Sequence, residues 1–273
     1  LAAATSGLTE AEGIFKRLGN KRSHCVVLCN LAELLLWQGD LGEALRRGTD
    51  ALHLARDVQY RVGQAAAHRV RAMALLDAGD LNSAGVDLDR ALEISEQQRM
   101  PDEVVSTRFL CGRLALRLSD PSGSIAHIKV GLEAAQRGDP ESYALLLEAM
   151  FARATCVDGR QEQGRSMLET LTDRLSDLAI PRFTQVMVVM ALAWKTLGED
   201  ERAMDCADQA ARMASTRGFR LWSLYARMIM AEVGEGERSE LAHTEAAMLA
   251  KDMCRTMPPE LADHFRRRRG IGA

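Results

Sequence analysis

A chain of 273 residues that is 47% hydrophobic and 27% charged has the composition of an ordinary globular protein. Its formal net charge of −3 excludes a long-range positive field that would attract nucleic acid, and it has no apolar run of about 18 residues that could cross a membrane. Aromatic residues contribute only 4%, while alanine, leucine, methionine and arginine abound, so the chain is expected to be all helical.

The cysteines and basic residues indicate a cellular setting. Six cysteines are spread along the chain without a C-x-x-C pair, which favours reduced thiols in the core of a cytoplasmic protein. Only five of the 35 basic residues are lysine, and the excess of arginine and alanine is typical of a GC-rich bacterial genome. The chain starts at Leu1 without a methionine, so we expect a piece of a longer protein.

The predicted helices follow one another in pairs. Residues 8–18 are expected to form the last helix of a truncated repeat within residues 1–20, and the repeat domain is expected to end at residue 257. Residues 258–273 are expected to form a capping helix from Glu260 and a basic tail, Arg266–Arg269, after the stop signal Pro258-Pro259. We expect the paired helices at 23–38 and 41–56, 60–78 and 81–98, 102–118 and 121–137, 141–157 and 160–177, 182–197 and 200–216, and 219–233 and 237–256.

A period of about 40 residues underlies these assignments. A tight turn recurs at positions 39, 79, 119, 159 and 198, which are almost evenly spaced along the chain. The positions seven before, five after and twelve after each turn make a set of fifteen, and fourteen of them hold Ala, Gly or Ser. Because antiparallel helices approach closely only where side chains are small, each turn is expected to join the two helices of one hairpin.

Residues that cap helices and residues that end helices indicate the same positions for the turns and for the boundaries between hairpins. Aspartates suited to cap the following helix come directly after three of the turns, at Asp40, Asp80 and Asp120. Prolines that should separate one hairpin from the next recur with nearly the same period as the turns, at Pro101, Pro140 and Pro181. The chain is therefore expected to stack about six helix hairpins into a right-handed α-α superhelix.

The first repeat, Asn30-Leu-Ala-Glu-Leu-Leu-Leu-Trp-Gln-Gly-Asp-Leu-Gly-Glu-Ala-Leu, resembles the tetratricopeptide (TPR) repeat. That family has a small residue at its eighth position, Gly-Asp at the turn, and alanine at its twentieth and twenty-seventh positions. The usual repeat is shorter, at about 34 residues. The longer period here is similar to the repeats of bacterial ATP-dependent transcription activators of the maltose-regulator type and of kinase–ATPase signalling proteins. The resemblance implies a TPR-like solenoid that works in signalling or transcription regulation.

The TPR resemblance also implies a binding groove, because the first helices of stacked hairpins line the concave surface. Arg69, Arg113 and Arg153 recur with nearly the period of the turns and could form a ladder that faces an acidic peptide. The alternative is that these arginines pair with acidic residues of neighbouring helices. The groove candidates are Glu33, Trp37, Arg69, Met73, Phe109, Arg113, Arg117, Arg153 and Leu192.

The sequence contains no catalytic, phosphate-binding or metal-binding motif, so we expect neither an enzyme nor a bound cofactor or metal. The preferred hypothesis is a regulatory scaffold that binds a protein or peptide partner, without direct contact to nucleic acid or membrane. The alternative is a small-molecule-sensing solenoid of a transcription regulator. Apolar residues of the first helix also predict a homodimer, through Leu8, Ile14, Phe15 and Leu18.

Overall fold

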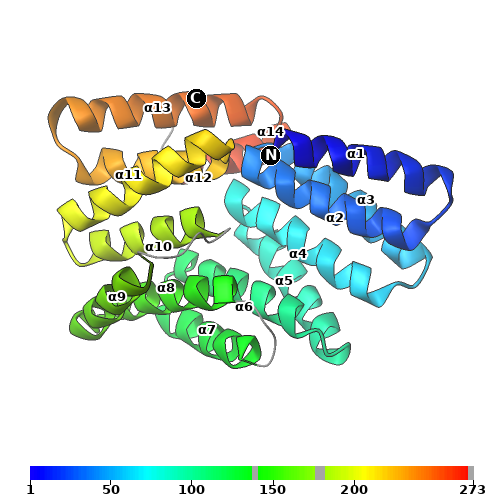
Figure 1. Ribbon diagram of the computed structural model, residues 1–273, viewed down its shortest axis with the longest axis horizontal. Coiled ribbons are helices and arrows are strands. Elements are labelled where there is room, and N and C mark those ends of the chain that lie inside the picture. The colour runs from blue at the N-terminus through cyan, green and yellow to red at the C-terminus, as the bar shows by residue number, and fades with distance from the viewer. Residues whose placement is uncertain (137–140, 176–181, 270–273) are drawn as a thin grey trace. The chain divides into compact units, whose positions relative to one another are not determined.

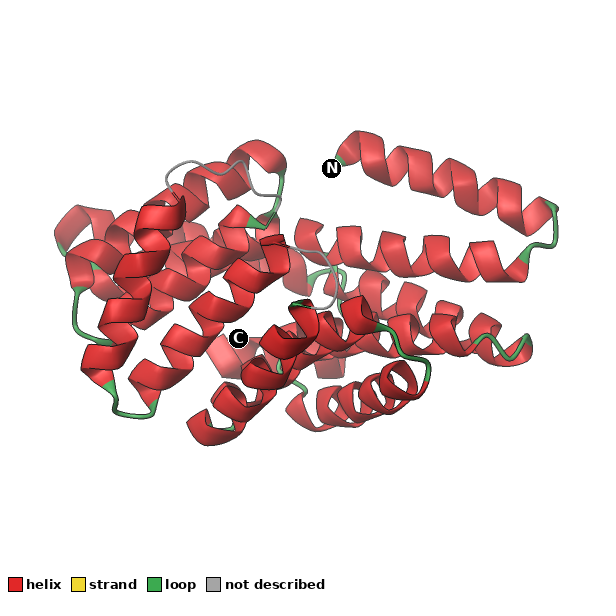
Figure 2. Cartoon of the chain, turned by 60° about the horizontal axis from the view of Figure 1, so that its bottom comes forward, coloured by secondary structure: helices red, strands yellow, loops and turns green. Residues whose placement is uncertain are grey.

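The computed structural model describes residues 1–136, 141–175 and 182–269, with the side chains of Glu141, Ser142, Arg268 and Arg269 outside that description. In this part of the chain every regular element is a helix (Figure 2). The helices are α1 (Ala2–Arg17), α2 (Lys21–Gln38), α3 (Leu41–Asp57), α4 (Arg61–Ala78), α5 (Leu81–Gln97), α6 (Pro101–Arg117), α7 (Pro121–Ala135), α8 (Glu141–Val157), α9 (Gln161–Leu175), α10 (Phe183–Thr196), α11 (Asp200–Arg217), α12 (Arg220–Val233), α13 (Gly236–Cys254) and α14 (Pro259–Arg269).

The helices form two compact units, and each is described by itself. The first unit contains residues 1–103 together with the segment that begins at Ala250, and the second contains residues 104–249. Within the first unit, α2 packs against α3 and α4, and α4 packs against α5, so hairpin follows hairpin (Figure 1). Within the second unit, α8 packs against α7, α9 and α10, and α12 packs against α10 and α11. The expected all-helical repeat fold is confirmed.

All five predicted turns are corners between paired helices. Gly39, Gly79, Ser119, Gly159 and Gly198 have φ angles of 83°, 98°, 62°, 85° and 71°. This left-handed conformation ends a helix and turns the chain back, and glycine adopts it without the steric cost that a side chain adds. Ser119, the residue that departs from the glycine pattern, adopts the same conformation and therefore carries that cost.

Hydrogen bonds local to each corner complete it. The N–H of Asp40 donates to the carbonyl of Leu35 at 2.9 Å, and the residue after each of the other four corners makes the equivalent bond. The carboxylate of Asp40 then accepts the N–H of Glu43 at 3.2 Å, and Asp80 and Asp120 cap their helices in the same way. The corners are thus specified by residues within a few positions of one another, which is why the sequence predicts them.

The small residues lie where paired helices touch. All fifteen positions of the set defined by the turns are buried. A Cβ added to Gly112 of α6 would lie 2.6 Å from Cδ1 of Ile128 on α7, and one added to Gly164 of α9 would lie 2.3 Å from Sγ of Cys156 on α8. Real Cβ atoms do not approach so closely, so a side chain at either position would force its neighbour to move.

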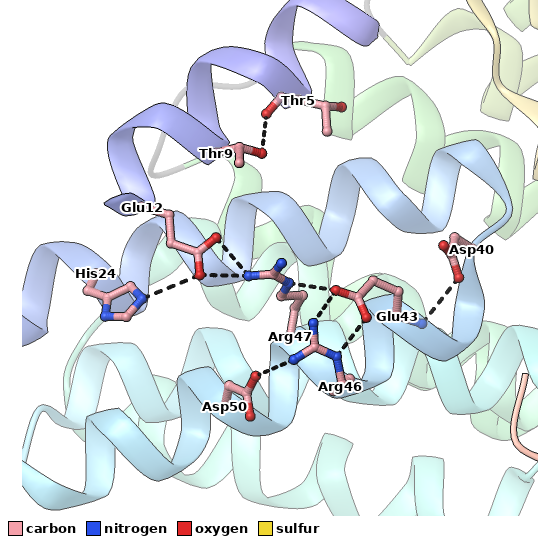
Figure 3. Close-up of polar contacts among 9 residues, drawn as sticks. All are labelled: Thr5, Thr9, Glu12, His24, Asp40, Glu43, Arg46, Arg47 and Asp50. Carbon is pink, nitrogen blue, oxygen red and sulfur yellow. Dashed lines mark hydrogen bonds and ion pairs between the residues drawn. The ribbon is translucent and has the colours of Figure 1, made fainter. Parts of the chain in front are cut away.

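The first helix begins earlier than predicted, at Ala2 instead of residue 8, because the alanines at its start are strong helix formers. It has no buried residue and is attached through charged groups (Figure 3). Both carboxylate oxygens of Glu12 accept from Nη1 of Arg47 on α3 at 2.7 Å, and Arg47 Nε also donates to Glu43 at 2.8 Å. Glu12 lies 3.7 Å from His24 of α2 as well. Polar contacts therefore connect α1 to both following helices.

The apolar residues of α1 remain accessible. Ile14 is 38% exposed and Leu18 is 71% exposed, while Leu8 and Phe15 are half-buried. The homodimer predicted through this face stays a prediction, which light scattering can test.

The C-terminal segment belongs to the first unit. Helix α14 packs against α4, and Phe265 of α14 is fully buried. Met253 contacts the corner at Gly39, where an added Cβ would lie 3.1 Å from its Cγ. The helix expected from Glu260 exists and extends to Arg269, so the run of arginines lies in its last turns. Its position against α4 was not predicted from the sequence.

Within the described residues, the bounds of the remaining predicted helices lie within two residues of the observed ones, and the predicted ends at 137 and 177 lie outside those residues. Pro140 and Pro181, which are expected to separate repeats, lie outside the described residues.

Candidate binding pocket

In the second unit, the first helices of four successive hairpins contribute to one pocket. Helix α10 packs against α8 and α12, so these three helices lie side by side. The pocket has a volume of about 170 Å³. We call it the arginine pocket; its lining residues are Phe109, Arg113, Leu116 and Arg117 of α6, Met150 and Arg153 of α8, Val188, Val189 and Leu192 of α10, and Trp222, Tyr225, Met228, Ile229 and Glu232 of α12.

Two of the arginines come from α6. Arg113 and Arg117 lie one helical turn apart, a spacing at which like charges repel. The guanidinium of Arg113 lies over two aromatic rings, at 5.9 Å from the centroid of Phe109 and 5.9 Å from that of Trp222. Because Trp222 belongs to α12, three hairpins further along the chain, this contact shows that the second unit curls around the pocket.

The third arginine of the pocket, Arg153, comes from α8. Its Nε is buried without a hydrogen-bond partner, and no residue that the structure describes makes an ion pair with its guanidinium. The pKa of Arg153 is lowered to about 10, first by burial and then by the charges of Arg113 and Arg117. The cation therefore opposes folding, because the favourable effect of Tyr225 on its charge is smaller than the cost of its desolvation.

One acidic residue is among those that line the arginine pocket, and it is already paired. The carboxylate of Glu232 forms an ion pair with Lys195 of α10. Burial and the nearby charge of Arg153 lower the pKa of that lysine. The lining of the arginine pocket thus carries an excess of positive charge beside apolar and aromatic walls.

The groove candidates of the first unit behave differently. Arg69 of α4 donates from Nε to Glu103 at 2.7 Å and from Nη1 to Glu33 of α2 at 3.4 Å. Its guanidinium also contacts Sδ of Met73, which is buried, and Trp37 is half-buried on α2. The charge of Arg69 is therefore neutralised by acidic residues of neighbouring helices, the alternative that the sequence left open.

The structure brings five of the nine groove candidates into the arginine pocket: Phe109, Arg113, Arg117, Arg153 and Leu192. The ladder of three arginines is not uniform, since Arg69 is paired and Arg153 is not. Their registers explain the difference. Arg113 and Arg153 lie six residues before their corners, whereas Arg69 lies ten before its corner and so occupies an earlier helical turn.

The contribution of α12 to the pocket was not predicted from the sequence. Arg153 lies six residues before its corner, and Arg117 lies two residues before its corner. Met228 and Glu232 lie six and two residues before Gly234, which ends α12, so the same spacings would have identified both residues.

Tyr225 lies nine residues before Gly234, the spacing at which Met150 and Val189 precede their own corners. Trp222 lies twelve residues before Gly234 and carries no such signal, and it enters the pocket because the second unit curls, which only long-range packing determines.

A second pocket lies among α9, α10 and α11 and has a volume of about 720 Å³. Its apolar floor includes Phe183, Met187 and Trp194, and its rim includes Glu169 and Arg202, which form an ion pair at 3.0 Å. None of the nine groove candidates lines it.

Over the described ranges, no group of three histidine, cysteine or acidic side chains is placed to hold a metal ion. No helix in the same ranges has the length and apolar character needed to cross a bilayer.

A pair of matched variants measures the contrast between the two arginines. Arg153→Met should raise the free energy of unfolding by about 1 kcal/mol, because it removes an unpaired buried cation, while Arg69→Met should lower it by about 2 kcal/mol, because it leaves two carboxylates without their partner. Urea denaturation at pH 7, followed by circular dichroism, measures both changes.

The pH dependence of the Arg153→Met effect follows from the lowered pKa. The folded-state pKa of about 10 lies below the ordinary value of an arginine, so the charge destabilises the folded protein throughout the range below pH 10. The increase in the free energy of unfolding caused by Arg153→Met should therefore be equal at pH 6 and pH 9. A loss of stability in Arg153→Met would show that the guanidinium has a stabilising partner.

Comparison with known proteins supports the fold. No protein-family model and no curated protein sequence matches the chain. A Rap protein complexed with competence and sporulation factor aligns with a TM-score of 0.65 at 12% identity, over 92% of this chain and 74% of that one. The apo form of RapI aligns with a TM-score of 0.60 at 11% identity, over 98% and 99%. BtubC (BKLC) from P. vanneervenii aligns with a TM-score of 0.58 at 16% identity, over 79% and 91%. The chain has the fold of a TPR-like helical repeat protein.

Proposed function

We propose that this chain is a non-catalytic interaction module that receives part of a protein or peptide partner in its arginine pocket. The observation that carries the proposal is the convergence of α6, α8, α10 and α12 on one pocket. A cavity of about 150 Å³ holds one benzene molecule, so a pocket of about 170 Å³ suits a single side chain of a larger partner. Aromatic residues and arginines are also the residue types that dominate binding hot spots.

The comparisons add support of a coarser kind. A Rap protein of similar fold forms a complex with competence and sporulation factor, so this architecture can hold a partner. The resemblance of the long repeats to those of bacterial regulators extends the proposal: partner binding serves signalling or transcription control in the cytoplasm of a bacterial cell.

Selection from a displayed library of random linear peptides tests this function. Wild-type protein should enrich particular sequences, and Leu192→Glu should weaken their binding at least about tenfold, because the new carboxylate occupies the pocket and pairs with its arginines. Fluorescence anisotropy with synthetic peptides measures the change. Leu241→Glu is the matched control, since Leu241 is 61% exposed on α13 and does not line the pocket. Failure to enrich any peptide, or equal binding by both variants, would contradict the proposal.

The second pocket favours the alternative function, a small-molecule sensor. Its volume of about 720 Å³ falls in the range of about 300–1,000 Å³ that is usual for ligand sites. Thermal-shift screening against metabolites distinguishes the two functions, because a ligand present at about 100 times its dissociation constant adds about 2.7 kcal/mol of stability. A metabolite whose effect is lost in Trp194→Ala but kept in Leu192→Glu would favour the sensor.

A further inference from the structure

Arg153 places a charge in the arginine pocket that packing alone does not explain. It shares the lining with Arg113 and Arg117, and the carboxylate of Glu232 is engaged by Lys195. Arg113 is positioned by the two rings it lies over, which hold its guanidinium at the pocket. Arg153 thus adds a cation, partly buried and with its Nε fully covered, to a small space that already holds positive charge, an arrangement that is unfavourable unless an anion joins it.

Two buried donors in this pocket have no acceptor. Nε of Arg153 and Nε1 of Trp222 are both buried without a hydrogen-bond partner, and Trp222 is only 5% exposed. Buried polar groups in folded proteins are nearly always hydrogen-bonded, so two orphaned donors that line one pocket call for an explanation. An oxyanion supplies both things that are missing, acceptor lone pairs and negative charge.

The walls indicate what the anion is attached to. Besides the cations, the lining includes Phe109, Met150, Val188 and Leu192, which offer no hydrogen bonds to a freely hydrated ion. A compact inorganic anion would leave these apolar surfaces uncovered, whereas an apolar group bearing a carboxylate covers them and presents its oxygens to the guanidinium fork.

We propose that the arginine pocket is a carboxylate receptor that binds the C-terminal residue of a peptide partner, with the terminal carboxylate at Arg153 and Trp222 and an apolar side chain against α8 and α10. This inference rests on the proposed function and names the chemistry of the partner. The lowered pKa of Arg153 agrees with it, since burial beside two other cations is the cost that a bound carboxylate offsets.

Small probes test the receptor without knowledge of the partner. Phenylacetate carries a carboxylate on an apolar ring, phenylacetamide is its neutral counterpart, and inorganic phosphate is an anion without the apolar part. The chain has three tryptophans, and the indole N–H signal of Trp222 can be assigned with Trp222→Phe. Titration of ¹⁵N-labelled protein should move this signal with phenylacetate and leave it in place with phenylacetamide and phosphate.

Variants locate the binding group. Arg153→Gln should weaken phenylacetate binding at least about tenfold, as expected when a charge-assisted hydrogen bond is lost. Arg212→Gln is the charge-matched control and should change affinity less than about twofold, because Arg212 pairs with Asp208 on the exposed face of α11, outside the pocket. Circular dichroism verifies that both variants fold. Equal shifts with the acid and the amide, equal binding of phosphate, or full affinity in Arg153→Gln would each overturn the receptor.

Peptides separate this inference from the proposed function. Peptides selected by the library should lose at least about tenfold in affinity when their C-terminus is amidated. If peptide binding is weakened by Leu192→Glu but not by amidation of the peptide, the proposed interaction module is supported and the carboxylate receptor is contradicted. If phenylacetate binds but no peptide does, the pocket is a site for a free small acid. That result would contradict both the binding of a peptide C-terminus and the proposed function.

Discussion

Phe265→Ala should lower the free energy of unfolding of the first unit by about 3–5 kcal/mol, the usual cost of deleting a buried phenylalanine ring. Phe265 is fully buried in α14, and Met257, Leu261 and Ala262 of the same segment are also buried. Because α14 packs against α4, the loss of stability should affect helices in the first third of the chain, which are far from Phe265 in sequence. The cavity cannot close easily, since α4 is held between α3 and α5.

Urea denaturation and hydrogen exchange measure this effect. Amide protons of α4 should exchange faster in Phe265→Ala, while those of α9 and α10, in the second unit, should keep their protection. His264→Ala is the control, because the neighbouring His264 is exposed and its replacement should change stability by less than about 0.5 kcal/mol. A loss below about 1 kcal/mol in Phe265→Ala would show that α14 does not contribute to the first unit.

Gly42→Ala should cost about 3 kcal/mol, a large effect for one methyl group, because overpacking forces backbone to move. Gly42 lies in the first turn of α3, and a Cβ there would meet the carbonyl oxygen of Thr256 at 2.2 Å. A flexible side chain could move aside, but Thr256 offers its backbone. The substitution should therefore displace the C-terminal segment from α3.

Limited trypsin digestion reports that displacement. Arg255 is exposed and precedes Thr256, so cleavage after Arg255 should be faster in Gly42→Ala than in the wild type. Gly7→Ala is the matched control. An added Cβ at Gly7 has no neighbour within 4 Å, and alanine favours an exposed helix by about 0.5–1 kcal/mol over glycine. Equal cleavage rates in Gly42→Ala and the wild type would contradict the observed packing.

Together, the Phe265→Ala and Gly42→Ala variants test whether the C-terminal segment stabilises the first unit. Met253 packs at the corner after α2, and Phe265 is buried in the helix that packs against α4, so this segment covers apolar surface of hairpins from the other end of the sequence. A truncation that removes everything after Leu249 is therefore expected to weaken the first unit more than the second.

The sequence by itself determined the elements and their corners, because the forces responsible act over a few residues. Left-handed residues such as Gly39 and capping residues such as Asp40 make hydrogen bonds within one turn, so their chemistry can be read without knowing the fold. The spacing of small residues likewise predicted which helices pair, since each pair is consecutive in the chain.

Only the tertiary structure decided which charges are compensated and which surfaces meet. Arg69 and Arg153 are the same residue type in related helices, yet Arg69 has partners on two neighbouring helices and Arg153 has an unpartnered buried nitrogen. The approach of Trp222 to Arg113 and of Phe265 to the first unit depends on how hairpins stack over several repeats. Such contacts follow from the sum of many packing angles, which no local pattern encodes.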